Sequence, residues 1–165
     1  QLLFQSEWAD VDYLFIDLPP GTGDIQLTLS QKIPVTGSVV VTTPQDIALI
    51  DAKKAVDMFQ KVNIPIFGVL ENMSVHICSH CGHSEAIFGH DGGKQLAGKL
   101  GVPLLGQLPL SLPVREAMDA GTAKQMQEAQ PAIAEIYTHA AWALALAVAD
   151  KGKDFSSRFP KIVVE

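Results

Sequence analysis

An aspartate followed by a stiff, glycine-containing turn is the first group of residues with the types and spacing needed for chemistry. Asp17 comes directly after the apolar run 11–16 and precedes the turn 19–23, of sequence Pro-Pro-Gly-Thr-Gly. Prolines stiffen a turn, and glycines let backbone N–H groups approach an anion. A carboxylate that holds Mg²⁺ beside a loop that senses the terminal phosphate of a nucleotide requires these parts. The alternative is an ordinary strand-to-helix turn capped by Asp24, but it leaves Asp17 without a role, because burying a lone carboxylate is costly.

A pair of cysteines forms the second such group. Cys78 and Cys81 are spaced C-x-x-C, and the histidines around them are His76, His80, His83 and His90. A thioredoxin-like redox pair usually lies at a helix N-terminus, which this His-rich loop does not predict. A mononuclear zinc site could take both sulfurs and two histidines. An iron–sulfur cluster held by four thiolates would need a second copy of the chain, with the two identical loops meeting at a two-fold axis.

Two further positions are weaker candidates. Asn72 follows an apolar run, and its amide can donate and accept at once, as the edge of an adenine base requires. Asn is also common in turns that bind nothing. Arg115 and Asp119 are four residues apart in a predicted helix, which is the spacing of an exposed ion pair.

Strands that alternate with helices must position these residues. Uncharged, β-branched runs predict strands, and apolar residues at helical spacing predict helices. The predicted strands are 11–16, 37–43, 65–70 and 103–108, and the predicted helices are 24–32, 46–62, 92–100, 114–120 and 131–149, with the end of another helix before residue 9. This order indicates an α/β fold with a mostly parallel sheet and helices on both faces. Such folds place ligands at the carboxyl ends of the strands, where Asp17 and Asn72 lie.

The helix patterns also predict which side chains are buried and which residues begin each helix. Asp24 and Asp46 are the expected caps of the first two long helices. The apolar side chains expected to pack are Ile25, Leu27, Leu29 and Ile33 in the first, and Ile47, Ile50, Ala55, Met58, Phe59 and Val62 in the second. The alanine-rich stretch 131–149 is apolar nearly all round, so we expect a helix packed into the protein.

Composition and length restrict the class of protein. The 165 residues predict one domain, residues 1–149, followed by a tail, 150–165. A net charge of −6 without a basic run argues against a nucleic-acid partner. The uninterrupted apolar part of 131–149 is too short for a membrane span, and the first residues lack the features of a signal peptide. The only two cysteines cannot form a disulfide framework, so a cytoplasmic location is expected.

Several ordered motifs resemble the Mrp/ApbC family. These proteins are deviant P-loop ATPases, related to MinD and to the nitrogenase iron protein, that carry iron–sulfur clusters. Segment 12–24 is similar to their Walker B and switch II segment. Further similar segments follow in the family's order at 41–45, 71–74, 78–83, 88–89 and 105–110. The resemblance runs from about Trp8 to about Gly121. Ser79 stands where the family commonly has proline, and Gly121-Thr122 lacks a proline that often follows there, but both sulfurs are in place.

The resemblance implies a role for each candidate residue. Catalysis of ATP hydrolysis would involve Asp17, Gly21 and Thr22, with Asp17 holding Mg²⁺. ATP would be bound by Asp17, Pro20, Gly21, Thr22, Gly23, Asn72, Pro109 and Leu110, the last three around the adenine. Cys78 and Cys81 would hold a [4Fe-4S] cluster that bridges a homodimer through this loop. The partners would then be a second copy and the recipient iron–sulfur apoproteins, with no nucleic acid and no membrane.

The phosphate-binding loop of a P-loop ATPase is missing from this sequence. No segment matches G-x-x-x-x-G-K-[ST], because none of the lysines that follow glycine, which are Lys94, Lys99 and Lys153, precedes Ser or Thr. In the family this loop lies upstream, and its strand lies beside the Walker B strand inside the sheet. We therefore expect the chain to be the C-terminal half to two-thirds of such a protein, without a central strand and inactive alone. The alternatives are a MinD-like partitioning ATPase, whose basic amphipathic tail is not evident at 151–165, and a non-enzymatic zinc-binding module.

Overall fold

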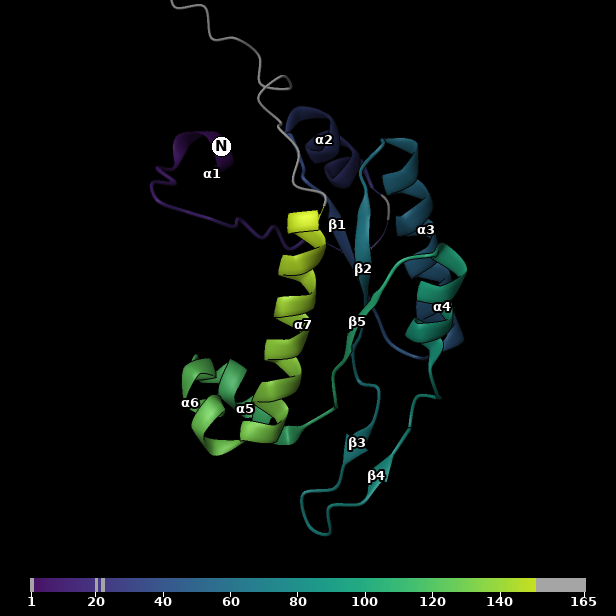
Figure 1. Ribbon diagram of the computed structural model, residues 1–165, viewed down its shortest axis with the longest axis vertical. Coiled ribbons are helices and arrows are strands. Elements are labelled where there is room, and N and C mark those ends of the chain that lie inside the picture. Colours follow the sequence, from purple (N-terminus) through teal and green to yellow (C-terminus); the bar gives the residue numbers. More distant parts are fainter. Residues whose placement is uncertain (1, 20, 22, 151–165) are drawn as a thin grey trace, which may run out of the picture.

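A three-stranded parallel sheet organises the computed structural model, which describes residues 2–19, 21 and 23–150 (Figure 1). The strand order is β1-β2-β5, with β1 at Ser38–Thr42, β2 at Ile66–Glu71 and β5 at Leu104–Gln107. A short antiparallel hairpin, β3 (His76–Ile77) and β4 (Ser84–Glu85), extends beyond the sheet. Uncharged, mostly apolar sequence made the three parallel strands recognisable, and the predicted α/β fold with a parallel sheet is confirmed.

Helices cover both faces of this sheet. Their bounds are α1 Leu2–Gln5, α2 Asp24–Lys32, α3 Asp46–Lys61, α4 Gly92–Leu100, α5 Leu112–Asp119, α6 Ala123–Ala129 and α7 Pro131–Asp150. Helices α3 and α4 pack on one face, and α7 packs across β5 and β2 on the other (Figure 1). The predicted helices are confirmed, whereas α6 was not predicted. Its sequence buries only Met126, so it has no apolar periodicity to recognise.

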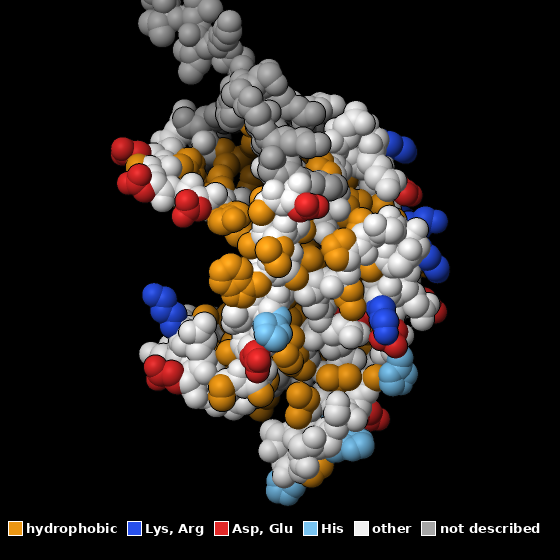
Figure 2. Space-filling view, viewed as in Figure 1, with side chains coloured by type: hydrophobic (Ala, Val, Ile, Leu, Met, Phe, Trp, Pro, Cys, Tyr) orange, Lys and Arg blue, Asp and Glu red, His pale blue; other side chains and the backbone are white. Residues whose placement is uncertain are grey.

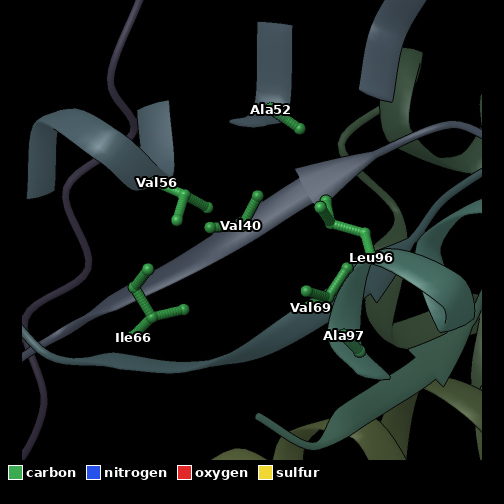
Figure 3. Packing of buried hydrophobic residues seen from close by; sticks show 7 residues of the cluster. All are labelled: Val40, Ala52, Val56, Ile66, Val69, Leu96 and Ala97. Carbon is green, nitrogen blue, oxygen red and sulfur yellow. The ribbon is translucent and has the colours of Figure 1, made fainter. Parts of the chain in front are cut away.

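The main core lies between the sheet and helices α3 and α4. Figure 3 shows its side chains pointing toward one another from the two strands and the two helices. The cluster consists of Val40, Ala52, Val56, Ile66, Val69, Leu96 and Ala97. Burying aliphatic side chains of this size stabilises a fold by about 1.5–3 kcal/mol each. This layer therefore fixes the sheet whose carboxyl edge carries the candidate site.

Two details of the helices differ from the prediction. Helix α3 packs through Ala52, Val56 and Phe59, whereas Ile47 is 75% exposed and Ile50 is 55% exposed. Ala52, Val56 and Phe59 recur four and three residues apart and form one stripe, and only this stripe meets the sheet. The N-caps are Gln45 for α3 and Gly23 for α2, so the predicted capping aspartates at 46 and 24 are instead the first helical residues.

The predicted strand 11–16 is wrong. These residues form no ladder, and all are exposed, up to 73% for Phe15. Tyr13 and Phe15 only stack on each other, with ring centroids 6.5 Å apart. A strand that is apolar on both faces needs a neighbour to pair with and layers to cover it, and β1, β2 and β5 form the described sheet without it. The expectation that Asp17 is buried is also wrong, because that side chain is exposed.

Helix α7 is less buried than expected. Ile133, Ala134 and Ala140 are buried, but Trp142 is 66% exposed and Leu146 is 68% exposed. Figure 2 shows hydrophobic side chains gathered over this helix. Within residues 2–150 as described, it is the one helix long and apolar enough to cross a membrane by length and composition, although it packs on β2 and β5. The predicted tail, apart from Asp150, lies outside the described residues.

Candidate functional site

The carboxyl ends of the three parallel strands form a hydrogen-bonded edge around Glu71. This residue ends β2, and its side chain is fully buried, with 0% exposure. Its carboxyl group accepts a hydrogen bond of 2.5 Å from the backbone N–H of Gly93 and one of 2.7 Å from the side-chain amide of Gln107. Gly93 lies in the first turn of α4, and Gln107 ends β5. One carboxyl group thus joins β2, β5 and α4.

Beyond Glu71 the chain continues to pair with the segment that follows β5. The backbone N–H of Leu108 donates to Glu71 O at 2.7 Å, that of Ser74 donates to Leu108 O at 3.0 Å, and that of Leu110 donates to Val75 O at 2.7 Å. The buried Ser74 hydroxyl also donates to Leu108 O. A parallel bridge then joins His76 to Leu110. Residues 108–110, which include the two residues expected to contact adenine, therefore lie beside residues 74–76, which lead into the cysteine hairpin.

Asn72 lies at this edge, as predicted. Its backbone N–H donates to Thr42 O at 2.7 Å, which links the end of β2 to the end of β1. Its side-chain Oδ1 accepts from the N–H of Met73 at 2.9 Å, as in a side-chain-stabilised turn. The amide nitrogen is the part of the side chain that can donate to a ligand. Pro109 is buried and Leu110 is half-buried.

The two cysteines lie at the turn of the β3–β4 hairpin. The N–H of Cys78 donates to His83 O, and the N–H of Gly82 donates to Cys78 O, both at 2.9 Å. Cys78 is half-buried and Cys81 is exposed. Figure 2 shows histidine side chains over this hairpin. Both cysteines therefore lie in one exposed turn at the end of the hairpin, away from the parallel sheet (Figure 1).

The surroundings of Cys78 favour its thiolate. Its pKa lies below the ordinary value of 9.0, because the backbone N–H of Cys81, the backbone N–H of His80 and the Cys81 side chain hydrogen-bond to the sulfur and outweigh the opposing effect of burial. A thiolate is the form that binds metal. Among residues 2–19, 21 and 23–150, no three His, Cys, Asp or Glu side chains come together as metal ligands.

The turn after Asp17 is held by a buried glutamine. Gln26 is only 3% exposed, and its Nε2 donates to Pro19 O at 2.7 Å and to Gly21 O at 3.2 Å. Gly21 has φ of 93°, a conformation that glycine adopts without strain. Asp17 and Gly23 are exposed beside it. Pro20 and Thr22, the other predicted residues of this turn, lie outside the described residues.

Gln26 and Glu71 were missed as site residues. Gln26 is the third residue of α2, and a Gln at this position often reaches back to the chain before the helix, so the sequence Gly-Asp-Ile-Gln carried a usable signal. Glu71 entered the sequence analysis only within the family-like segment 71–74, because its partners at 93 and 107 are distant in sequence. The predicted surface pair is confirmed: Arg115 and Asp119 are 2.9 Å apart and exposed.

Comparisons with known proteins identify similar sequences. The chain is 59% identical over 137 residues to an iron–sulfur cluster carrier protein of Pseudomonas fragi, covering 83% of this chain and 48% of that protein. The carrier protein of Escherichia coli K12 is 58% identical over the same share of this chain and 37% of its own length. The mouse iron–sulfur cluster transfer protein NUBPL is 49% identical, covering 86% of this chain and 44% of that protein. The chain thus spans less than half the length of these relatives.

A solved structure supports the fold. A nucleotide-binding protein of Archaeoglobus fulgidus in complex with ADP superimposes with a TM-score of 0.63 and 34% identity, covering 70% of this chain and 48% of that one. The family model ParA, described as NUBPL iron-transfer P-loop NTPase, matches residues 1–145. The chain therefore belongs to the ParA family of NUBPL-type iron-transfer P-loop NTPases.

Proposed function

We propose that this chain is the cluster-binding, C-terminal part of an ATP-dependent carrier that delivers iron–sulfur clusters to apoproteins. The observation that carries the proposal is the position of Cys78 and Cys81. They lie at the turn of a hairpin whose base pairs with residues 108–110 at the carboxyl edge of a parallel sheet, where α/β folds bind ligands. The relatives named as cluster carriers support the same assignment.

The nucleotide side of the proposal uses the turn and the edge. Asp17 would hold Mg²⁺, and Gly21, Thr22 and Gly23 would contact the γ-phosphate; the positive φ of Gly21 favours an open turn of this kind. Asn72, with Pro109 and Leu110, would recognise the adenine. Magnesium would neutralise charge that develops on the phosphates during transfer. The residues of this chain would position the nucleotide and sense its terminal phosphate.

A strand from the rest of the protein would complete this site. Strand β1 lies at an edge of the described sheet, its Val41 is 58% exposed, and segment 11–16 is mostly apolar and forms no ladder. A strand between the two would convert segment 11–16 into the strand that the sequence predicts. It would also bring the phosphate loop, which this sequence lacks, beside Asp17. ATP hydrolysis is therefore assigned to the longer protein, with the 165-residue chain as an inactive control.

The cluster would be cargo shared between two copies of the chain. Each copy offers two thiolates, and a four-iron cluster is held by four. The hairpin turn is exposed, so two copies can bring identical turns together on a two-fold axis. The low pKa of Cys78 suits metal binding, which requires a deprotonated sulfur.

Anaerobic reconstitution with iron and sulfide tests the proposal. We expect about four irons per dimer and conversion of monomer to dimer, measured by metal analysis with light scattering. Cys78→Ser and Cys81→Ser should each remove both cluster and dimer. Ser79→Ala, between the two sulfurs, is the matched control and should retain both.

A mononuclear zinc site would give the opposite pattern. It would hold one zinc per monomer, need no dimer and lose its metal when one of the four nearby histidines is changed. Single His→Ala variants at positions 76, 80, 83 and 90 separate the two cases. Stoichiometric zinc on a monomer, retained after treatment with iron and sulfide, would overturn the cluster-carrier proposal.

A further inference from the structure

The loop that carries the cysteines begins and ends at the same buried side chain. It leaves the sheet at Asn72, immediately after Glu71, and returns at Asp91, immediately before α4. Gly93 in that helix donates to Glu71 Oε2 at 2.5 Å. Both arms of loop 72–91 are therefore joined through one carboxyl group that solvent does not reach.

The start of α4 packs closely against Glu71. A Cβ atom at Gly93 would lie 2.8 Å from Glu71 Cβ and 3.0 Å from its Oε2. A Cβ atom at Gly92 would lie 2.5 Å from the carbonyl oxygen of Pro44, a residue between β1 and α3. Two successive residues without side chains thus let the start of α4 approach both Pro44 and Glu71. Such a fit is sensitive to small shifts.

Each end of the loop also has a residue in the left-handed conformation. Met73 and Asp91 both have φ of 55°, which is uncommon for residues other than glycine. The N–H of Met73 is held by Asn72 Oδ1 at 2.9 Å. The amide of Gln107 lies 2.7 Å from Glu71 Oε1 and 3.4 Å from Asp91 Oδ1. The residues around Glu71 therefore hold Met73 and Asp91, the left-handed residues at the two ends of loop 72–91.

The same carboxyl group is joined to the segment assigned to adenine. Gln107 directly precedes Leu108, whose N–H donates to Glu71 O. Pro109 and Leu110 follow, and Leu110 pairs with Val75 and His76, two residues before Cys78. A shift of residues 108–110 by a bound base would act on the hairpin directly and on the return arm through Gln107 and Glu71.

We propose that Glu71 is a positioning residue that couples occupancy of the base pocket to the conformation of the cysteine hairpin. The coupling rests on the proposed function, since it needs both a nucleotide and a cluster. Glu71 itself touches neither. It makes the two arms of loop 72–91 move together with residues 107–110, so that a nucleotide changes the accessibility of Cys78 and Cys81. This is a contact route distinct from the turn that contains Gly21.

Cysteine alkylation in the full-length protein tests this coupling. The rate of modification by iodoacetamide is measured at Cys78 and Cys81 with and without ADP. In the wild type we expect the nucleotide to change the rate by about 5-fold or more, the usual lower range of allosteric coupling. In Glu71→Gln the rate with ADP divided by the rate without ADP should lie close to one at each cysteine. The dissociation constant for ADP should change little. Glu85→Gln, an exposed carboxylate on the hairpin itself, is the matched control and should keep the wild-type ratio.

The ratio distinguishes coupling from a purely structural role. If Glu71→Gln only loosens the loop, alkylation becomes faster both with and without ADP, and the ratio of these two rates stays as in the wild type. That outcome would overturn the proposal. A ratio of one in the wild type would overturn it as well. If Glu71→Gln yields no folded protein, Gln107→Met is used instead. This variant removes the donor of the hydrogen bond to Glu71 Oε1 and should also bring the ratio of the rates with and without ADP close to one. A normal ratio in that variant overturns the proposal. Iron binding of the wild type is measured in parallel, so that failure of the proposed function is seen separately.

Discussion

The edge around Glu71 and the turn after Asp17 differ in how completely this chain builds them. At the edge, β1, β2, β5 and α4 are joined by hydrogen bonds to one buried carboxyl group and to the backbone beside it. At the turn, one buried side chain of helix α2, Gln26, donates hydrogen bonds to two carbonyl groups of the turn. Asp17, Pro19, Gly21 and Gly23 are exposed.

The difference shows which part of the site is self-sufficient. The hydrogen bonds described at the edge and in the cysteine hairpin join residues within 38–110. The turn has a local conformation but lacks the strand and the phosphate loop that would fix its position relative to the sheet. Perturbing the edge should therefore affect folding, whereas perturbing the turn should affect nucleotide chemistry.

Removing the buried carboxyl group should have the largest effect. Glu71→Ala leaves the Gly93 N–H and the Gln107 amide without their acceptor, and each unsatisfied group costs about 1–3 kcal/mol. We expect the free energy of unfolding to fall by about 2–5 kcal/mol, measured by urea denaturation. The control is Asp17→Ala, which should change it by no more than about 0.5 kcal/mol. Equal losses would contradict the contrast between edge and turn.

The second effect concerns ATP hydrolysis by the full-length protein. Asp17→Asn removes the charge proposed to hold Mg²⁺ through water, and such outer contacts are worth about 10- to 100-fold in activity. Phosphate release should fall by that factor, while the iron content after reconstitution stays unchanged. Asp12→Asn, an exposed aspartate on the same segment, should behave as the wild type. Parallel loss of iron in Asp17→Asn would indicate a folding defect instead.

A smaller effect is expected at the side chain that holds the turn. Gln26→Leu removes two hydrogen bonds to carbonyl groups that water can then reach, at a net cost of about 1 kcal/mol. Hydrogen exchange of the Gly21 amide should speed up by about 5-fold. Gln31→Leu, an exposed glutamine of the same helix, should leave that rate unchanged. Unchanged exchange in Gln26→Leu would mean that the turn holds itself.

The smallest effect is a shift in the reactivity of one thiol. Because the pKa of Cys78 is lowered, its thiolate should persist below the pH range of an ordinary thiol near 9.0 and be lost only as pH falls through the lowered value. In the Cys81→Ala variant, which removes one of the causes, the midpoint of the alkylation rate at Cys78 should move upward. Rates measured between pH 6 and 10, as an approximate range around the ordinary thiol pKa, provide the test. A midpoint at or above 9.0 in the otherwise unchanged chain would contradict it.

The contrast also explains which features could be predicted from sequence. Strands β1, β2 and β5 have sequences without charged residues apart from Glu71 at the end of β2, and they are fixed by a core within this chain, so their positions were predictable. Segment 11–16 is also mostly apolar, but a strand depends on a partner, and in the described structure this segment pairs with none of β1, β2 and β5. Periodicity gave the existence of α3, yet its buried stripe depends on where the sheet lies.

Site residues follow the same rule. The cysteine pair was evident because Cys78 and Cys81 are close in sequence, whereas Asn72 was named from the predicted strand that it follows and from the family resemblance. Glu71 gained significance only when the fold brought Gly93 and Gln107 to it. No local sequence pattern indicates that these three residues are in contact.

The sequence separation of these contacts has a consequence for the order in which the protein folds. The hairpin bond from Cys78 to His83 closes a short loop, whereas the bond from Gln107 to Glu71 joins residues 36 positions apart. Short loops close early, and contacts between distant residues form late, because their closure costs more entropy. We expect both thiols to be presented before the edge of the sheet is assembled. An incompletely folded chain would then already be able to capture iron, and metal present during synthesis would influence folding as well as function.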